Sequence, residues 1–377
     1  MQLTHKYLSN LTPLRGLAAI WVVVFHFQAL IKFLPEKTYL VSKGYMMVDL
    51  FFIMSGFIIY HVYKESFQKR ISLINFRRFG VARFARVYPL HFITLIICIP
   101  WFVIEWGWGD FTSPTGIITN IFLVHSFGFH KTFTWNFASW SISAEWWAYM
   151  VFPFTTFFLY RKKQVAITVL LIFIVLSYMG IIYWIPRMDP NDPKMPAPHN
   201  MDATFDFGFL RGLAGFTTGM LVYKLYESGF MRKIFHRDIT AILVIIITLV
   251  SLHFNLNDGL CLILFALIVF TFAQSNRFLH RICNNQLAQY LGNISYSIYL
   301  VQIFPFAALI FWEIKLPGVL YPKDANPTTS FLIGAGYALI YVILLIGLSS
   351  LSYYFIEKPC RKYINARWGK QQMPVYA

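Results

Sequence analysis

The sequence has few charged residues and few cysteines, and both shortages narrow what the chain can be. Charged residues make up 13% of its 377 positions, and 16 of them are acidic. This is about half the charge of an ordinary soluble domain. The four cysteines form no Cys-x-x-Cys pair, so we expect neither a disulfide framework nor a bound metal. No internal repeat and no low-complexity segment is present, which argues against a repeat protein or a disordered chain.

What the chain has instead is a series of hydrophobic runs of about 20 residues, the length of a helix that crosses a bilayer. Hydrophobic residues make up 58% of the sequence, and the mean hydropathy is +0.57. We therefore predict an all-α, polytopic membrane protein in which residues 1–377 form a single integral-membrane domain. The ten expected spans cover residues 14–33, 45–63, 87–104, 138–159, 164–184, 204–224, 238–254, 258–274, 290–312 and 329–353.

The basic residues give these spans a direction. Lysine and arginine total 32, which leaves a net charge of +16. Most of them fall in connections on the same side of the predicted membrane as the N-terminus, and cytoplasmic loops carry such an excess. The expected topology places both ends of the chain in the cytoplasm. The positive charge therefore indicates membrane orientation and contact with anionic membrane lipid, and we expect no nucleic-acid partner.

The first predicted span carries two ionisable side chains, Arg15 and His26. They are eleven positions apart, which corresponds to about three helical turns, roughly 16 Å of rise and nearly the same face. Ionisable groups inside a span are costly and usually serve a pathway or a reaction. An imidazole titrates near neutral pH, which suits a general base. We expect Arg15 at the mouth of a pore and His26 partway through it.

The second predicted span carries a carboxylate, and a cluster of arginines precedes the third. Asp49 lies near the outer end of the second span, and Ser55 and Gly56 behind it favour close packing of a neighbouring helix. Four arginines and no lysine precede the third span: Arg77, Arg78, Arg83 and Arg86. Guanidinium groups bind phosphate through paired hydrogen bonds. Both a phosphate-bearing ligand and a simple orienting or lipid-binding role fit this cluster.

The fourth span opens with Trp140, Ser141, Glu145 and Trp146. Ser141 and Glu145 are four positions apart and therefore share one helix face. The tryptophans fit stacking on sugar rings and equally fit anchoring at the membrane interface.

Charged and polar groups also occur in later spans. We expect Asp206 and Arg211 to pair with each other and Glu357 to pair with an arginine, since intramembrane charges tend to pair. Tyr299 lies on a polar helix face that suits the wall of a cavity.

Together these segments resemble the membrane acyltransferase 3 family, which includes bacterial O-acetyltransferases of cell-surface glycans. The resemblance covers almost the whole chain and follows the family's order. Its segments are Arg15 with His26, and residues 49–57, 83–89, 140–145, 295–300 and 355–359. The chain departs from the family at Gln302, where histidine is frequent, and at Met47, where the family has glycine.

The resemblance implies an enzyme of the bacterial inner membrane that takes an acyl group, usually acetyl, from cytoplasmic acyl-CoA. The acceptor would be a hydroxyl of a cell-envelope glycan, such as lipopolysaccharide O-antigen or exopolysaccharide. Acetyl-CoA would be bound by five arginines: Arg15, Arg77, Arg78, Arg83 and Arg86. His26 would be the general base, with Glu145 or Asp49 holding the imidazolium. The candidate acceptor-binding residues are Ser141, Trp140, Trp146, Arg211 and Tyr299.

Two questions stay open at this point. Direct transfer and a covalent relay through His26 or Ser141 both fit the sequence. The alternative from a different class is a transporter or flippase for a sugar- or lipid-linked substrate, with a purely structural subunit as a third option.

Overall fold

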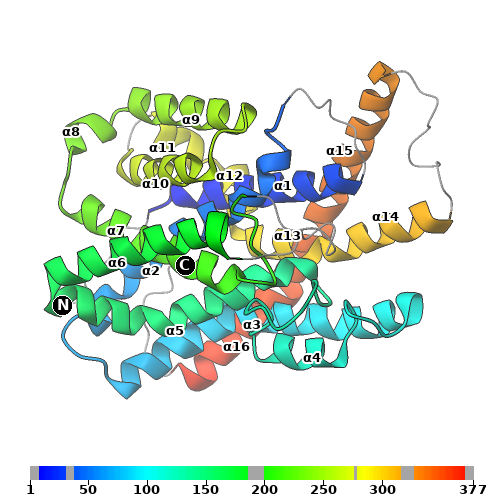
Figure 1. Cartoon of the computed structure of the whole chain (residues 1–377), viewed down its shortest axis with the longest axis horizontal. Helices are drawn as coiled ribbons and strands as arrows, with labels where there is room; N and C mark the ends of the chain where they lie inside the picture. Colours follow the sequence, from blue (N-terminus) through cyan, green and yellow to red (C-terminus); the bar gives the residue numbers. More distant parts are fainter. Residues whose placement is uncertain (1–7, 31–37, 186–198, 276–277, 316–326, 370–377) are drawn as a thin grey trace.

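A computed structural model describes residues 8–30, 38–185, 199–275, 278–315 and 327–369. Every regular element in these ranges is a helix (Figure 1). The predicted all-α architecture is therefore confirmed for the described residues.

With residues 31–33 of the first segment outside the described residues, each of the ten predicted segments overlaps a helix or a run of helices. These are α1 (Leu11–Leu30), α2 (Met47–Phe67), α3 (Leu73–Trp106), α5 (Trp140–Arg161), α6 (Lys163–Met179), α7 (Gly208–Glu227), α9 (Asp238–His253), α10 (Asp258–Gln274), the run α12–α14, and α15 (Pro327–Ser352). The run consists of α12 (Gln286–Asn293), α13 (Ser295–Val301) and α14 (Ile303–Lys315). Shorter elements connect or extend them: η1 (Ser42–Met46), α4 (Pro114–Ile121), η2 (Phe137–Ser139), η3 (Gly180–Trp184), α8 (Arg232–Phe235), α11 (Phe278–Cys283), η4 (Tyr353–Glu357) and α16 (Lys358–Trp368).

Judged by length and composition, fewer helices than expected qualify as membrane spans. Five helical segments among the described residues are long and apolar enough to cross a membrane, and the bent pair of α12 with α13–α14 makes a sixth. The expected count of ten is thus not confirmed. Helices α9 and α10, with 16 and 17 residues, are apolar but short. Helix α5 carries serine, threonine, tryptophan and tyrosine residues, and α7 carries glycines, threonines and two basic residues, which lower their hydropathy.

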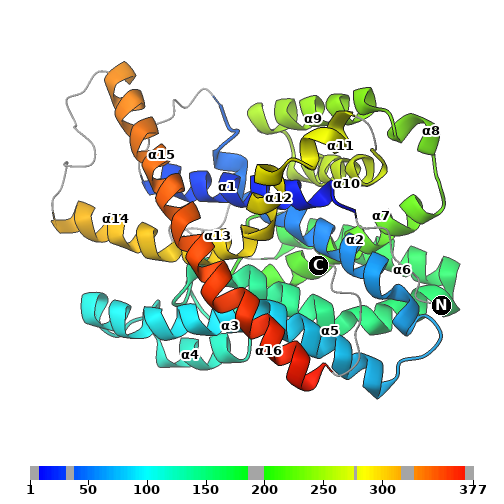
Figure 2. The same cartoon turned by 180° about the vertical axis from the view of Figure 1, so that it is seen from behind.

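Most of the long helices run along one direction of the molecule, and α15 is inclined across them (Figures 1 and 2). The connection from α2 to α3 lies at one end, and α4 and the far part of α14 lie at the other. Helix α1 runs through the interior, between the α9–α10 layer and the α3–α5 layer. The helix with the arginine and histidine pair therefore packs between these layers, with Leu17 and Ala29 exposed along it.

Glycines let α2 and α7 pack closely. A Cβ added to Gly56 would overlap the carbonyl group of Phe216, and one added to Gly219 would overlap the carbonyl group of Ile53. The backbones are close enough at this crossing to exclude even a methyl group. The predicted packing role of Gly56 is confirmed, and it agrees with the use of small residues at helix contacts in membranes.

Replacing Gly56 by alanine is expected to destabilise the protein, because the added methyl group forces α2 away from α7. Overpacking of this kind costs about 1–3 kcal/mol, so the thermal unfolding midpoint in detergent should fall. Gly80→Ala in α3 is the matched control, because a Cβ there meets nothing within 4 Å. Its midpoint should stay unchanged or rise slightly, since alanine favours helix by about 1 kcal/mol. Equal midpoints for both variants would contradict the close α2–α7 contact.

Candidate active site

Two cavities lie inside the bundle and share part of a wall. The first, about 80 Å³, is lined by Arg15, Arg83 and Arg86 among others and is called the arginine cavity. The second, about 540 Å³, is lined by His26 and is called the histidine cavity. Thus α1 contributes Arg15 to one cavity and His26 to the other.

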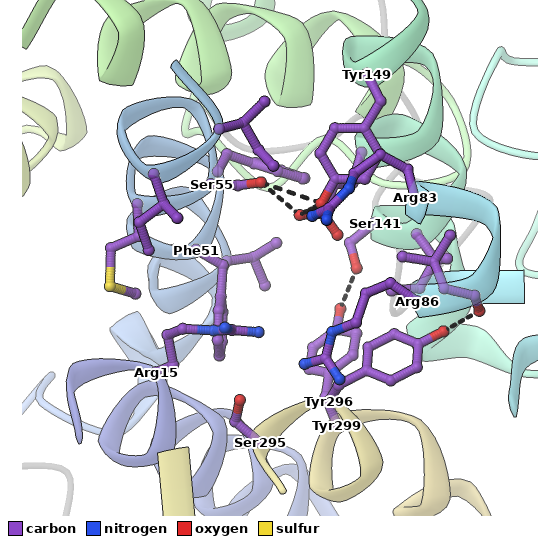
Figure 3. Close-up of a pocket in the computed structure, with 18 residues that line it drawn as sticks. Arg15, Phe51, Ser55, Arg83, Arg86, Ser141, Tyr149, Ser295, Tyr296 and Tyr299 are labelled. Carbon is purple, nitrogen blue, oxygen red and sulfur yellow. Dashed lines mark hydrogen bonds between the residues drawn. The ribbon is translucent and has the colours of Figure 1, made fainter. Parts of the chain in front are cut away.

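Three guanidinium groups face the arginine cavity (Figure 3). Arg83 donates a hydrogen bond to the Tyr63 hydroxyl over 3.0 Å. Arg86 forms a buried ion pair with Glu357 at 2.7 Å, which confirms the predicted pairing of that glutamate with an arginine. Arg15 makes no hydrogen bond or ion pair within the described residues. Its guanidinium is thus the group with the most hydrogen-bonding capacity left for a ligand.

The direction of Arg15 follows from the crossing of α1 with α12. A Cβ added to Gly292 would overlap the Thr12 carbonyl group, and one added to Gly16 would lie 2.8 Å from the Gly292 nitrogen. This backbone contact fixes the rotation of α1 about its own axis. Arg15, next to Gly16, is thereby held toward the cavity.

A carboxylate, Glu145, faces the same cavity as the arginines. It accepts hydrogen bonds from the Ser55 hydroxyl at 2.6 Å and the Tyr149 hydroxyl at 2.5 Å. Ser141 also lines this cavity, so the predicted common face of Ser141 and Glu145 is confirmed. The expected contact of Glu145 with His26 is wrong, because α5 presents this face to the arginine cavity.

His26 is instead held by Gln302. Nδ1 of His26 lies 2.9 Å from Oε1 of Gln302. The amide nitrogen of Gln302 donates to the Tyr299 carbonyl oxygen over 2.7 Å, which turns the amide oxygen toward the imidazole. An amide oxygen only accepts, so Nδ1 carries the hydrogen and Nε2 keeps the lone pair. The ring packs edge-on against Phe137, with centroids 4.8 Å apart.

Asp49 does not support the imidazole either. Its two carboxylate oxygens accept from Arg211 at 3.0 and 2.7 Å. Arg211 is 0% exposed, also contacts Asp202 at 3.5 Å, and lines neither cavity. The structure places Arg211 in a buried ion pair, and its expected substrate-binding role stays a prediction. The ion pair joins α7 to α2.

The expected pair between Asp206 and Arg211 is also wrong. The Asp206 carboxylate accepts from the backbone N–H groups of Thr204 and Phe207, both at 2.9 Å. These groups lie just before α7, where backbone donors lack helical partners. The Asp206 carboxylate therefore bonds to backbone groups near it in the sequence, and Arg211 pairs with Asp49 instead.

The histidine cavity combines aromatic rings with hydroxyl and carboxylate groups. Trp140 lines it as expected of a substrate-binding residue, whereas Trp146 lines neither cavity and packs near Phe84 at 6.1 Å. Other aromatic and polar residues that line the histidine cavity include Trp106, Asp110, Phe111, Thr112, Thr132, Phe133, Asp202 and Thr204. Most of these come from connections without helical periodicity, which is why the sequence patterns missed them.

Two of the expected arginines stand outside the cavities. Arg77 is exposed and Arg78 is half-buried, and both lie upstream of Arg83 on α3. Neither lines the arginine cavity.

Two other histidines, His91 and His125, have structural surroundings. Their rings stack with centroids 5.8 Å apart. His91 Nε2 bonds to the Asn120 carbonyl oxygen at 3.0 Å, and His125 Nε2 bonds to the Ser139 hydroxyl at 3.1 Å. Burial lowers the pKa of His125, which lies outside the spans, to about 3. It stays neutral at physiological pH and lines neither cavity.

The sequence is similar to several acyltransferases. A family model described as an acyltransferase domain matches residues 9–353. The putative peptidoglycan O-acetyltransferase YrhL of Bacillus subtilis is 24% identical over 95% of this chain and 55% of its own length. The acyltransferase MdmB of Streptomyces mycarofaciens is 30% identical over 39% of this chain and 38% of its own. The peptidoglycan O-acetyltransferase OatA of Listeria monocytogenes is 26% identical over 50% and 31%.

This chain therefore spans only part of these relatives, at most 55% of the length of the three. No solved structure matches it. The family match nevertheless runs from the start of α1 to the end of α15 and includes both cavities. The chain belongs to the membrane acyltransferase 3 family.

Proposed function

We propose that this protein transfers an acetyl group from acetyl-CoA to a hydroxyl group of a cell-envelope glycan. The observation that carries the proposal is the pair of adjoining cavities, one lined by arginines and the other by His26 with aromatic and acidic side chains. The names of YrhL and OatA as peptidoglycan O-acetyltransferases support both the acetyl group and a glycan acceptor.

The arginine cavity suits the donor. Coenzyme A carries phosphates at one end and a thioester at the end of a long arm, and guanidinium groups bind phosphate strongly. Arg15, Arg83 and Arg86 would hold the diphosphate. Arg77 and Arg78 lie on α3 about 9 Å before Arg83, within reach of the nucleotide part. The pantetheine arm carries two amide N–H groups, which suit the Glu145 carboxylate.

The histidine cavity suits the acceptor. Aromatic rings such as Trp140 and Trp106 offer flat apolar faces for a sugar ring. Asp110, Thr112 and Thr132 offer hydrogen-bond acceptors for its hydroxyl groups. A volume of about 540 Å³ lies within the range of small-molecule pockets and suits a sugar unit of a glycan.

His26 then acts as the general base in a direct transfer. Nε2 takes the proton from the acceptor hydroxyl while the oxygen attacks the thioester carbonyl carbon. The tetrahedral intermediate expels the CoA thiolate, which takes the proton from the imidazolium. One ester and one free thiol result. Gln302 keeps Nδ1 protonated throughout and so maintains the reactive tautomer.

We further propose the topology that the basic residues indicate. Ten spans, with both chain ends in the cytoplasm of a bacterial cell and the protein in the inner membrane, open the arginine cavity toward cytoplasmic acetyl-CoA. The histidine cavity then faces the envelope.

The first test removes the base. His26→Ala should lower acetyl transfer by about 10²–10⁴-fold, the usual contribution of a general base, while the protein still binds acetyl-CoA. The measurement is transfer of labelled acetyl to envelope glycan, with binding followed by thermal stabilisation. His253→Ala is the control, because His253 bonds to Thr38 and lines neither cavity. If the His26→Ala variant still transfers acetyl at the wild-type rate, His26 is not the general base.

The second test changes the partner of the imidazole. Gln302→Leu leaves Nδ1 without its acceptor and should lower kcat about tenfold, the range seen for groups that orient a functional histidine. Gln302→Glu restores an acceptor and adds a negative charge that stabilises the imidazolium. The rising limb of the pH–rate profile should then move to higher pH, since a deprotonated Nε2 is needed. An unmoved profile would show that this side chain does not act through His26.

The third test concerns the donor. Arg15→Ala and Arg83→Ala should raise the KM for acetyl-CoA, because each removes a phosphate contact worth about 1.5–3 kcal/mol. Arg15→Lys keeps the charge but loses the paired geometry and should be intermediate. Arg161→Ala, an exposed arginine over Phe157, is the control. If no acyl-CoA stabilises the wild-type protein, the transporter alternative is favoured.

A further inference from the structure

The arginine and histidine cavities meet at two side chains. Among the described residues, Val48 and Tyr299 alone line both cavities. Val48 is 5% exposed and Tyr299 is 6% exposed. They therefore form the wall through which a donor from one cavity must pass to reach His26 in the other.

Tyr299 is held in this wall at two points. Its hydroxyl oxygen accepts a hydrogen bond from Ser141 over 2.9 Å (Figure 3). Its carbonyl oxygen accepts from the Gln302 amide, which also holds His26. The backbone of Tyr299 is thus tied to the base, while the ring is tied to the arginine cavity through one hydroxyl contact.

The proposed reaction needs this wall to open. A thioester carbonyl must come within bonding distance of the acceptor oxygen at Nε2 of His26, yet Arg15 and His26 lie on opposite sides of Tyr299. The Tyr299 side chain turns about two bonds, whereas Val48 is stiff at its single side-chain torsion in a helix. Tyrosine is therefore the part that can move.

A closed wall also has a chemical use. Acetyl-CoA and water react beside a base to give acetate and free CoA, in the same way that acetyl-CoA and a glycan hydroxyl give the ester and free CoA. The two reactions differ only in the oxygen that attacks. Excluding water from the thioester is a general way in which enzymes suppress this loss.

We propose, on the basis of the function above, that Tyr299 is a gate between the cavities and that the hydrogen bond from Ser141 holds it closed. An arriving pantetheine arm offers carbonyl oxygens that accept the Ser141 hydrogen bond in place of the tyrosine hydroxyl. The exchange costs little, because one hydrogen bond replaces another. The ring then swings aside and admits the thioester to His26.

The test measures how much CoA release is coupled to acetyl transfer. Purified variants are given labelled acetyl-CoA with and without acceptor glycan, and free CoA, acetate and acetylated glycan are counted. Tyr299→Ala should raise acceptor-independent CoA release several-fold, because water then reaches the thioester, and lower the yield of ester per CoA released. Tyr299→Phe keeps the ring but loses the hydrogen bond from Ser141, and its acceptor-independent CoA release should rise less.

A matched control separates the gate from general loosening. Tyr290→Phe also removes a tyrosine hydroxyl that bonds to a serine, Ser350, at 2.6 Å, but it lines neither cavity. Its coupling should equal that of the wild type. His26→Ala in the Tyr299→Ala background should abolish the extra hydrolysis.

The outcomes distinguish the gate from the function on which it rests. If Tyr299→Ala still binds acetyl-CoA but its hydrolysis and coupling match the wild type, the gate is refuted and the transferase survives. If the wild type transfers no acetyl group, the proposed function fails with it. Should Tyr299→Ala not fold, Val48→Ala opens the wall from the other side, and unchanged hydrolysis in that variant refutes the gate.

Discussion

The site depends on the broken helix formed by α12, α13 and α14. The axis bends by 49° between residues 286–293 and 295–311, and all seven residues of α13 are buried. Gly292, at the end of α12, contacts the backbone of α1 at Thr12. The break then lets α13 place Tyr299 between the cavities and deliver Gln302 to His26.

Polar contacts hold the break in place. Asn136 donates to the Leu300 carbonyl oxygen at 3.1 Å, and Tyr341 donates to the Gln302 carbonyl oxygen at 3.2 Å. The Leu300 carbonyl lies at the interruption between α13 and α14, whereas the Gln302 carbonyl also accepts from the Phe306 N–H at 3.1 Å. Inside a membrane a carbonyl without a helical partner needs one from a neighbouring element, and Asn136, just before η2, supplies it for Leu300. The irregular backbone is tolerated because it is enclosed by protein.

Ion pairs join helices at three buried positions, and one of the paired residues, Arg86, also lines the arginine cavity. Arg211 is bound to Asp49, Arg86 to Glu357 and Lys43 to Asp258, and each pair joins helices distant in the sequence. Arg15 makes no such contact among the described residues, and His26 meets a neutral amide. An intramembrane charge is costly unless it is paired or used.

The sequence predicted the helices and the shared helix faces well, because both follow from local periodicity. Ser141 and Glu145 do face one cavity, and Gly56 does permit a close crossing. The sequence did not predict which helices pack against one another. Glu145 was assigned to His26, although the two face different cavities, because spacing within a helix does not show what lies opposite.

Gln302, as the hydrogen-bond partner of His26, limits which groups can take up the proton in the proposed reaction. An amide does not exchange protons readily, so Gln302 orients the imidazole without relaying its proton. The proton taken from the acceptor hydroxyl then has one acceptor available, the departing CoA thiolate. Because the alcohol loses a proton and the thiol gains one, the transfer needs no proton from either side of the membrane. The base is returned to its starting tautomer after each cycle, and a glutamine at this position is sufficient.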